Sequence, residues 1–232
     1  MNQIQSNKLV PINFSAHVII FFMLLEGITV PLVAISNNMI INNIVYSAYC
    51  GFIVAAICIL FLFKVLKKFI LKHSANIFGM NITHIDGIML IGILAGILLM
   101  VMFIVQFILF SNGANDYITG FLSGLLSIFV TLCFYEVMAR ISFFTIKITD
   151  NNSNKYQIHF AFKDIILLSI IFAIYELIVC PITGAWIPFT TWRVPVAILS
   201  GIIGGGIGGL FLYITTNYLK IKLRISLKYI NI

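Results

Sequence analysis

Six long apolar segments, separated by short polar stretches, constrain this chain more than any other feature of its sequence. A helix needs about 20 residues to cross the hydrocarbon core of a bilayer, and most of the segments approach or exceed that length. A soluble domain could not bury so much apolar surface, because 61% of the residues are hydrophobic and only 9% are charged. The sequence therefore predicts an all-α polytopic membrane protein with about six transmembrane helices. We place the segments at Ile12–Ile35, Ile44–Leu66, Gly87–Phe110, Tyr117–Ile146, Asp164–Cys180 and Val194–Tyr218.

Two of these segments depart from the length of a simple perpendicular span. Tyr117–Ile146 is too long, so we expect it to tilt or to begin at the membrane interface near Gly120 and Gly124. Asp164–Cys180 is short, and we expect Pro181 to end it, because proline removes a helical hydrogen bond.

The cationic side chains predict how the chain is oriented. All of them except Arg140 and Arg193 fall on one side of the predicted membrane. They are Lys8, Lys64, Lys67, Lys68, Lys72, Lys147, Lys155, Lys163, Lys220, Lys222, Arg224 and Lys228. Because cytoplasmic loops are enriched in Lys and Arg, we expect a multi-pass protein of the cell membrane with both termini in the cytoplasm. The net charge of +7 then favours contact with anionic membrane lipids and not with nucleic acid.

The first segment and the polar connectors predict a single transmembrane domain over residues 1–232. The first segment is too long for a cleaved signal peptide and contains Glu26 and Pro31. Lys64–Asp86 is predicted to be an amphipathic connector at the lipid headgroups, and Asp150–Asn154 to be a polar turn.

No pattern in the sequence predicts a metal or a cofactor. Gly201–Gly209 contains a formal G-x-G-x-x-G, but it lies inside an apolar span and follows no strand, so we interpret it as a site of close helix packing. No two histidines have helical metal-site spacing. They are His17, His73, His84 and His159. The cysteines are interpreted as small core residues, not as disulfides or ligands. They are Cys50, Cys58, Cys133 and Cys180.

All three glutamates lie inside predicted spans, whereas the four aspartates lie at span ends or in loops. At a helical rise of about 1.5 Å per residue, Glu136 lies about 15 Å from the predicted span end at Ile146. By the same rise, Glu176 lies about 18 Å from the predicted span end at Asp164. The two carboxyls are therefore expected to face each other near mid-membrane. Arg140 follows Glu136 by one helical turn and can pair with it.

Two interpretations of these glutamates remain open. In the first, Glu136–Arg140 is a structural ion pair, and Glu176 is a protonated acid bonded to a neighbouring span. In the second, Glu136, Arg140 and Glu176 form a polar site inside the membrane that is catalytic or handles cations. Glu26 lies close to Pro31, where it could satisfy backbone groups freed by the proline.

Two short motifs resemble those of the CPBP intramembrane protease family, the CAAX-prenyl-endopeptidase-like or Abi proteins. They are Tyr135–Arg140 (YEVMAR) and Phe172–Glu176 (FAIYE). In that family E-E-x-x-x-R lies on one span, F-x-x-x-H on the next and H-x-x-x-N/D on a later one. The similarity covers roughly residues 60–218, including the stretches Ile77–Gly96 and Ile198–Asn217. It implies a membrane endopeptidase with Glu136, Arg140 and Glu176 as candidate catalytic residues.

This chain departs from the family pattern at the residues that activate water. Tyr135 replaces the first glutamate, Glu176 replaces the histidine, and the tail Lys220–Ile232 has no histidine for the third motif. The resemblance therefore implies either a divergent intramembrane endopeptidase or a catalytically inactive relative that binds a membrane-embedded peptide or protein partner.

A small membrane transporter or substrate-capture subunit is the alternative function. Six spans suit it, and Trp186–Gly209 resembles the Pro- and Gly-rich segment of vitamin-binding S components, although that segment comes early in those chains. The loop with Trp186 and Trp192 is expected to lie in an outer interfacial belt, or to cover an outward-facing pocket.

Overall fold

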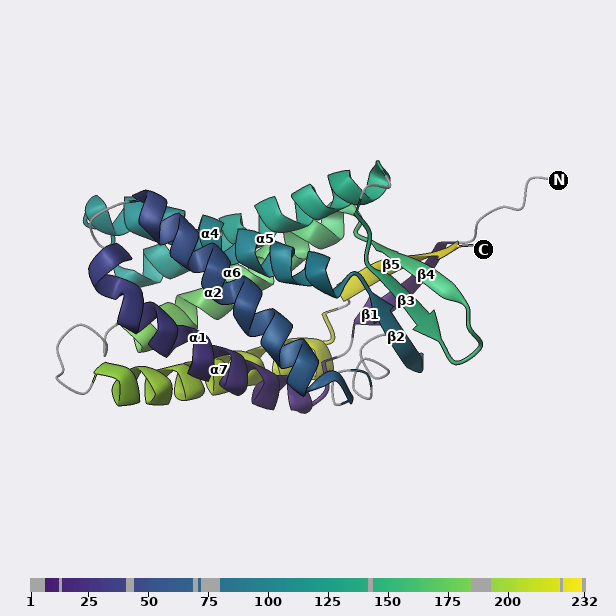
Figure 1. The fold of residues 1–232 in the computed structure, drawn as a ribbon, viewed down its shortest axis with the longest axis horizontal. Helices are drawn as coiled ribbons and strands as arrows, with labels where there is room; N and C mark the ends of the chain where they lie inside the picture. The colour runs from purple at the N-terminus through teal and green to yellow at the C-terminus, as the bar shows by residue number, and fades with distance from the viewer. Residues whose placement is uncertain are drawn as a thin grey trace.

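The computed structural model describes residues 7–12, 14–40, 44–68, 71, 80–141, 144–184, 193–221 and 223–230. In these ranges the chain forms long helices and one small sheet (Figure 1). The helices are α1 His17–Ile40, α2 Ile44–Val65, α4 Ile88–Ser111, α5 Asp116–Arg140, α6 Phe162–Gly184 and α7 Arg193–Asn217. The strands are β1 Asn7–Ile12, β2 Ile82–Asp86, β3 Lys147–Asp150, β4 Lys155–His159 and β5 Leu223–Ile230.

The helices confirm the predicted class of an all-α polytopic membrane protein. Within the described residues, α2, α4, α5, α6 and α7 are each long and apolar enough to cross a membrane. In α1 the described apolar stretch is His17–Leu32.

The six helices pack as a closed ring. Each one contacts two neighbours, in the order α1, α2, α4, α5, α6, α7 and back to α1. The glycines of α7 explain its close contact with α1, because a Cβ on Gly201 or Gly205 would collide with the carbonyl oxygens of Glu26 and Phe22. The prediction of close packing at Gly201–Gly209 is confirmed.

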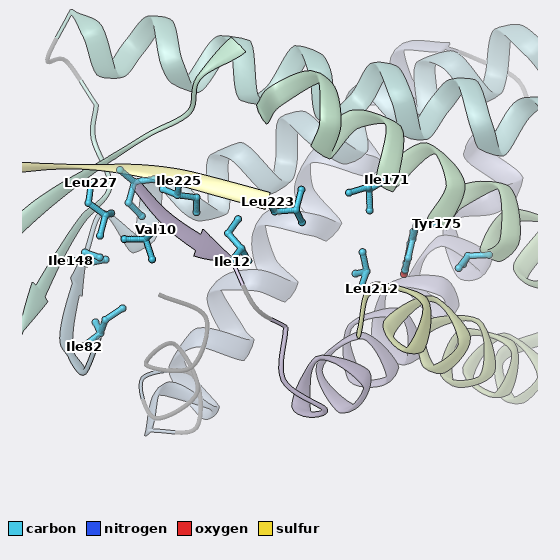
Figure 2. Packing of buried hydrophobic residues seen from close by; sticks show 12 residues of the cluster. Val10, Ile12, Ile82, Ile148, Ile171, Tyr175, Leu212, Leu223, Ile225 and Leu227 are labelled. Carbon is cyan, nitrogen blue, oxygen red and sulfur yellow. The ribbon is translucent and has the colours of Figure 1, made fainter. Parts of the chain in front are cut away.

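The five strands form an antiparallel sheet in the order β1-β5-β4-β3-β2 at one end of the bundle (Figure 1). Its buried face joins the helices in one apolar cluster. Figure 2 shows Leu223, at the start of β5, near Ile171 and Leu212 of the helices, with Val10 and Ile225 of the same cluster further along the sheet. Since β1 pairs with β5, the first and last described segments lie at the same end of the molecule.

The sheet corrects three of the predicted boundaries. The first span begins at His17 and not at Ile12, because Asn7–Ile12 pairs with β5. The fourth ends at Arg140 and not at Ile146, because the chain leaves the helix to form β3. The end of the predicted Lys64–Asp86 connector is strand β2, whereas residues 69, 70 and 72–79 lie outside the described ranges.

Pro181 lies inside α6, which continues to Gly184, so the prediction that it ends the span is wrong. Two residues further on, the Thr183 hydroxyl lies 3.0 and 3.3 Å from the carbonyl oxygens of Val179 and Cys180 and donates to them. The predicted polar turn at Asp150–Asn154 is confirmed between β3 and β4.

Candidate functional site

The ring of helices surrounds a cavity of about 850 Å³. All six helices contribute to its lining, and Ile12, Leu223 and Ile225 line it from the sheet. Asp116, at the start of α5, and Thr183, near the end of α6, line it at the ends of the helices that lie away from the sheet. Most of its lining is aliphatic or aromatic. Its polar lining residues are Glu26, Thr29, Gln106, Asp116, Glu176 and Thr183.

Glu176 lies where α5 and α6 approach most closely. A Cβ on Gly120 would collide with the Glu176 carbonyl oxygen, and one on Gly124 would lie 2.8 Å from the Glu176 Cβ. The two glycines therefore allow this contact. Glu176 is 6% exposed and lines the cavity, and its carboxyl makes no hydrogen bond within the described part of the chain.

Glu26 lines the same cavity from α1. The hydroxyl of Tyr175 donates a 3.0 Å hydrogen bond to its Oε1, and the Thr29 hydroxyl donates one of 3.2 Å to its Oε2. The Tyr175 ring stacks on Phe172 and fills the space left by Gly208, where a Cβ would collide with it. Glu26 and Glu176 therefore line the same cavity, and Tyr175, which bonds Glu26, directly precedes Glu176 on α6.

Glu136 occupies a different environment, at the sheet end of α5. Its Oε1 accepts hydrogen bonds from Arg140 Nε at 3.0 Å and pairs with His159 Nδ1 at 3.3 Å. Its Oε2 accepts the Phe160 backbone N–H at 3.0 Å. The neighbouring Tyr135 donates its hydroxyl to the Ile158 carbonyl at 2.7 Å. Tyr135 and Glu136 thus fasten the β4–α6 connection to α5, and the predicted Glu136–Arg140 pair is confirmed.

The expected meeting of Glu136 with Glu176 does not occur. Glu176 contacts α5 at Gly124, and Glu136 lies about 18 Å further along that helix at 1.5 Å of rise per residue. The depth predicted for Glu136 was wrong because α5 ends at Arg140. Of the three candidate residues, the structure pairs Glu136 with Arg140 and places Glu176 near Glu26.

The sequence interpretation missed Glu26 and His159 as partners of the candidate residues. A signal for the contact at Glu176 was present in α5, where small residues recur on one face and are buried. They are Thr119, Gly120, Ser123, Gly124, Ser127 and Thr131. Such a stripe indicates close approach of another helix. The contact between His159 and Glu136 depends on the sheet, which the sequence interpretation did not predict.

Within the described residues, no three His, Cys, Asp or Glu side chains are arranged to hold a metal ion. The four cysteines carry free thiols. Trp186 and Trp192 lie outside the described ranges.

No family model, curated protein or solved structure matches this chain.

Proposed function

We propose that this protein binds a small, largely apolar solute in the cavity of its helix ring, as a small transporter or as the substrate-capture subunit of an uptake system. The observation that carries the proposal is the closed ring around a cavity of about 850 Å³. Its volume falls within the range of about 300–1,000 Å³ that is usual for small-molecule sites. An apolar lining with a few polar groups is also typical of such sites.

The interior of the ring supports a binding role in preference to a purely structural one. Protein interiors are close-packed, and a helix bundle that served only as an anchor would fill its centre with side chains. Here the side chains that point into the ring, among them Ala55, Ala95 and Leu99, border an open cavity and do not fill it. A buried carboxyl beside such a space, here that of Glu176, is costly to maintain unless it serves a ligand.

We further propose that the sheet end faces the cytoplasm of a cell whose membrane the six helices cross. Lys147, Lys155, Arg224 and Lys228 all lie on strands of this sheet. Positive charge of this density is typical of the cytoplasmic side of a membrane protein. The cavity would then extend from the cytoplasmic sheet toward the outer helix ends.

A peptidase mechanism through Glu136 and Glu176 is not part of this proposal. Such a mechanism needs both carboxyls at one scissile bond, and the structure holds them at different levels of α5. Membership of the CPBP family, and binding of a membrane peptide by an inactive relative, remain predictions from the sequence resemblance.

Thermal unfolding of the purified protein in detergent tests the binding function. Three probes of similar bulk cover the charge classes: tetraphenylphosphonium, neutral triphenylphosphine oxide and tetraphenylborate. A probe that binds the folded state should raise the melting temperature as its concentration rises. At least one of the three is expected to do so.

Two matched variants on α4 localise this effect. Ala95→Phe places a ring in the cavity and should abolish the shift, whereas Ile93→Phe alters a side chain that is 37% exposed and absent from the cavity lining. The Ile93→Phe variant should keep the shift. Absence of a shift with all three probes, or equal shifts in the two variants, would overturn the proposed function.

A further inference from the structure

Among the described residues, the acidic groups of the cavity have no positive partner in its lining. Glu26, Asp116 and Glu176 line it, and its described lining contains no Lys, Arg or His. Glu136, the other buried glutamate, provides the contrast, because its carboxylate is satisfied by Arg140, His159 and a backbone N–H. Within one molecule, then, one glutamate is neutralised by the protein and others face an open space.

Glu176 is the group that most needs a partner. It is 6% exposed, and within the described residues its carboxyl receives no hydrogen bond, whereas Glu26 receives two. A polar group left unpaired in an apolar environment costs several kcal/mol on transfer scales, and an ionised one costs more. A ligand with a positive charge removes this cost.

We infer that the solute is a lipophilic organic cation and that Glu176 is its counter-charge in the cavity. This inference rests on the proposed function and specifies its substrate class. The lining suits both parts of such a ligand, since aliphatic walls accept its apolar body and the carboxyls accept its charge. Aromatic lining residues add favourable contacts with a cation. They are Phe14, Phe22, Phe103, Phe110, Phe160 and Phe172.

An inorganic cation fits this cavity less well. Calcium takes 6–8 oxygen ligands, and magnesium needs a near-ideal octahedron. The described residues contain no cluster of three His, Cys, Asp or Glu suited to a metal ion, and the cavity of about 850 Å³ is far larger than an ion. A bulky organic cation can touch the apolar walls and a carboxyl at the same time.

Glu26 has a supporting role in this arrangement. Tyr175 and Thr29 hold its carboxyl in place through their hydroxyl groups. It therefore supplies a second carboxyl at a fixed position, while the carboxyl of Glu176 has no such restraint among the described residues. Glu176 can thus pair directly with the ligand as it enters.

Equilibrium binding of radiolabelled tetraphenylphosphonium and tetraphenylborate to the purified protein tests this inference. The two ions have nearly the same size and shape and opposite charge. We expect the cation to bind at least about tenfold more tightly than the anion, because a like charge beside a buried carboxylate is strongly disfavoured. Glu176→Gln should weaken cation binding about tenfold or more and should leave anion binding no weaker.

Two further variants control for folding and for nonspecific uptake. Glu176→Asp retains the negative charge and should retain the preference for the cation. Glu136→Gln changes a buried glutamate that does not line the cavity and should leave cation binding unchanged.

The result also separates this inference from the proposed function. If the anion or triphenylphosphine oxide binds as tightly as the cation, and Ala95→Phe blocks them all, the cavity binds solutes but the cation inference is overturned. It is equally overturned if Glu176→Gln and Glu136→Gln behave alike. If no probe binds, the proposed function falls and this inference falls with it.

Discussion

The hydroxyl of Tyr175 donates a 3.0 Å hydrogen bond to the carboxyl of Glu26, which joins α6 to α1 beside the cavity. The two residues are far apart in the sequence, and their contact depends on the glycines of α7. A Cβ on Gly208 would collide with the Tyr175 ring, and one on Gly205 would lie 3.0 Å from the Glu26 Cβ. The three helices therefore position this carboxyl together.

Tyr175→Phe should destabilise the protein by about 0.5–1.5 kcal/mol, the usual net contribution of a hydrogen bond. The variant leaves the Glu26 Oε1 without its tyrosine donor. Chemical unfolding in a fixed detergent would measure the loss. Tyr213→Phe is the control, because no hydrogen bond to the Tyr213 hydroxyl occurs in the described residues, and it should change stability by less than about 0.5 kcal/mol. Equal effects of the two substitutions would contradict this role of Tyr175.

Gly120→Ala should separate α5 from α6 and destabilise the protein by about 1–3 kcal/mol, as overpacking commonly does. The added methyl group would collide with the backbone carbonyl of Glu176, which cannot rotate away. Gly206→Ala is the matched control, since its methyl group would meet only the flexible Met23 side chain, at 3.3 Å. Both melting temperatures can be measured under the same conditions. A Gly120→Ala variant as stable as Gly206→Ala would show that the helices are not in close contact there.

Glu136→Ala should cost more stability than Arg140→Ala. The first substitution leaves the Phe160 N–H without an acceptor and removes the partner of His159, at a cost of about 1–3 kcal/mol. The Arg140 side chain is 74% exposed, and an exposed ion pair contributes at most about 1 kcal/mol. Comparison of the two unfolding free energies checks this order. A larger loss of stability for Arg140→Ala would contradict this account. It would mean that the Glu136–Arg140 ion pair stabilises the protein more than the bonds from Glu136 to His159 and Phe160 do.

The β3–β4 turn should weaken in acid. Slight desolvation acts to raise the pKa of Asp150, but hydrogen bonds from Asn154, Asn152 and Tyr156 outweigh it and lower that pKa from its usual value. A lowered folded-state pKa gives a stability contribution that is present above the unfolded pKa and is lost as the pH falls through the folded one. Hydrogen exchange of the turn amides, corrected for intrinsic rates, should accelerate across that acidic range. Asp150→Asn should remove this pH dependence. If the exchange rates of the variant still depended on pH in the same way, another titrating group would be responsible.

Binding of tetraphenylphosphonium should tighten as the pH rises, because protons and the cation compete for the Glu176 carboxyl. Among the described residues, the other titratable groups are Glu26, Asp116 and Cys180, which line the same cavity, and Tyr175, which precedes Glu176 on α6. Dissociation constants measured over a pH series check this expectation. The change of the dissociation constant with pH should be much smaller in Glu176→Gln. If it were unchanged in that variant, protons would compete with the cation at one of the neighbouring groups and not at Glu176.

The helices of this fold could be predicted from the sequence because length and hydropathy determine membrane spans directly. The predicted spans Ile44–Leu66 and Val194–Tyr218 agree with α2 and α7 to within a residue at each end. The sheet was missed because its strands are short and adjoin the spans. In β5 a period of two was nevertheless visible, with Leu223, Ile225 and Leu227 buried between more polar neighbours.

The candidate site could be predicted only in part. The sequence showed that Glu176 lies in a span and that Glu136 can pair with Arg140, since both depend on local spacing. The proximity of Glu26 to Glu176 depends on how distant helices pack. Helical depth counted from predicted ends gave an incorrect partner, because the end of α5 was placed too far along the chain.

A crystal structure with tetraphenylarsonium bound would locate the ligand most directly, because its arsenic atom can be found by anomalous scattering. We predict one arsenic position inside the helix ring, next to the Glu176 carboxyl and on the same side of the cavity as Glu26. An arsenic atom found only on the lipid-facing surface of the helices, or at the sheet beside Glu136, would contradict both the binding cavity and the role of Glu176.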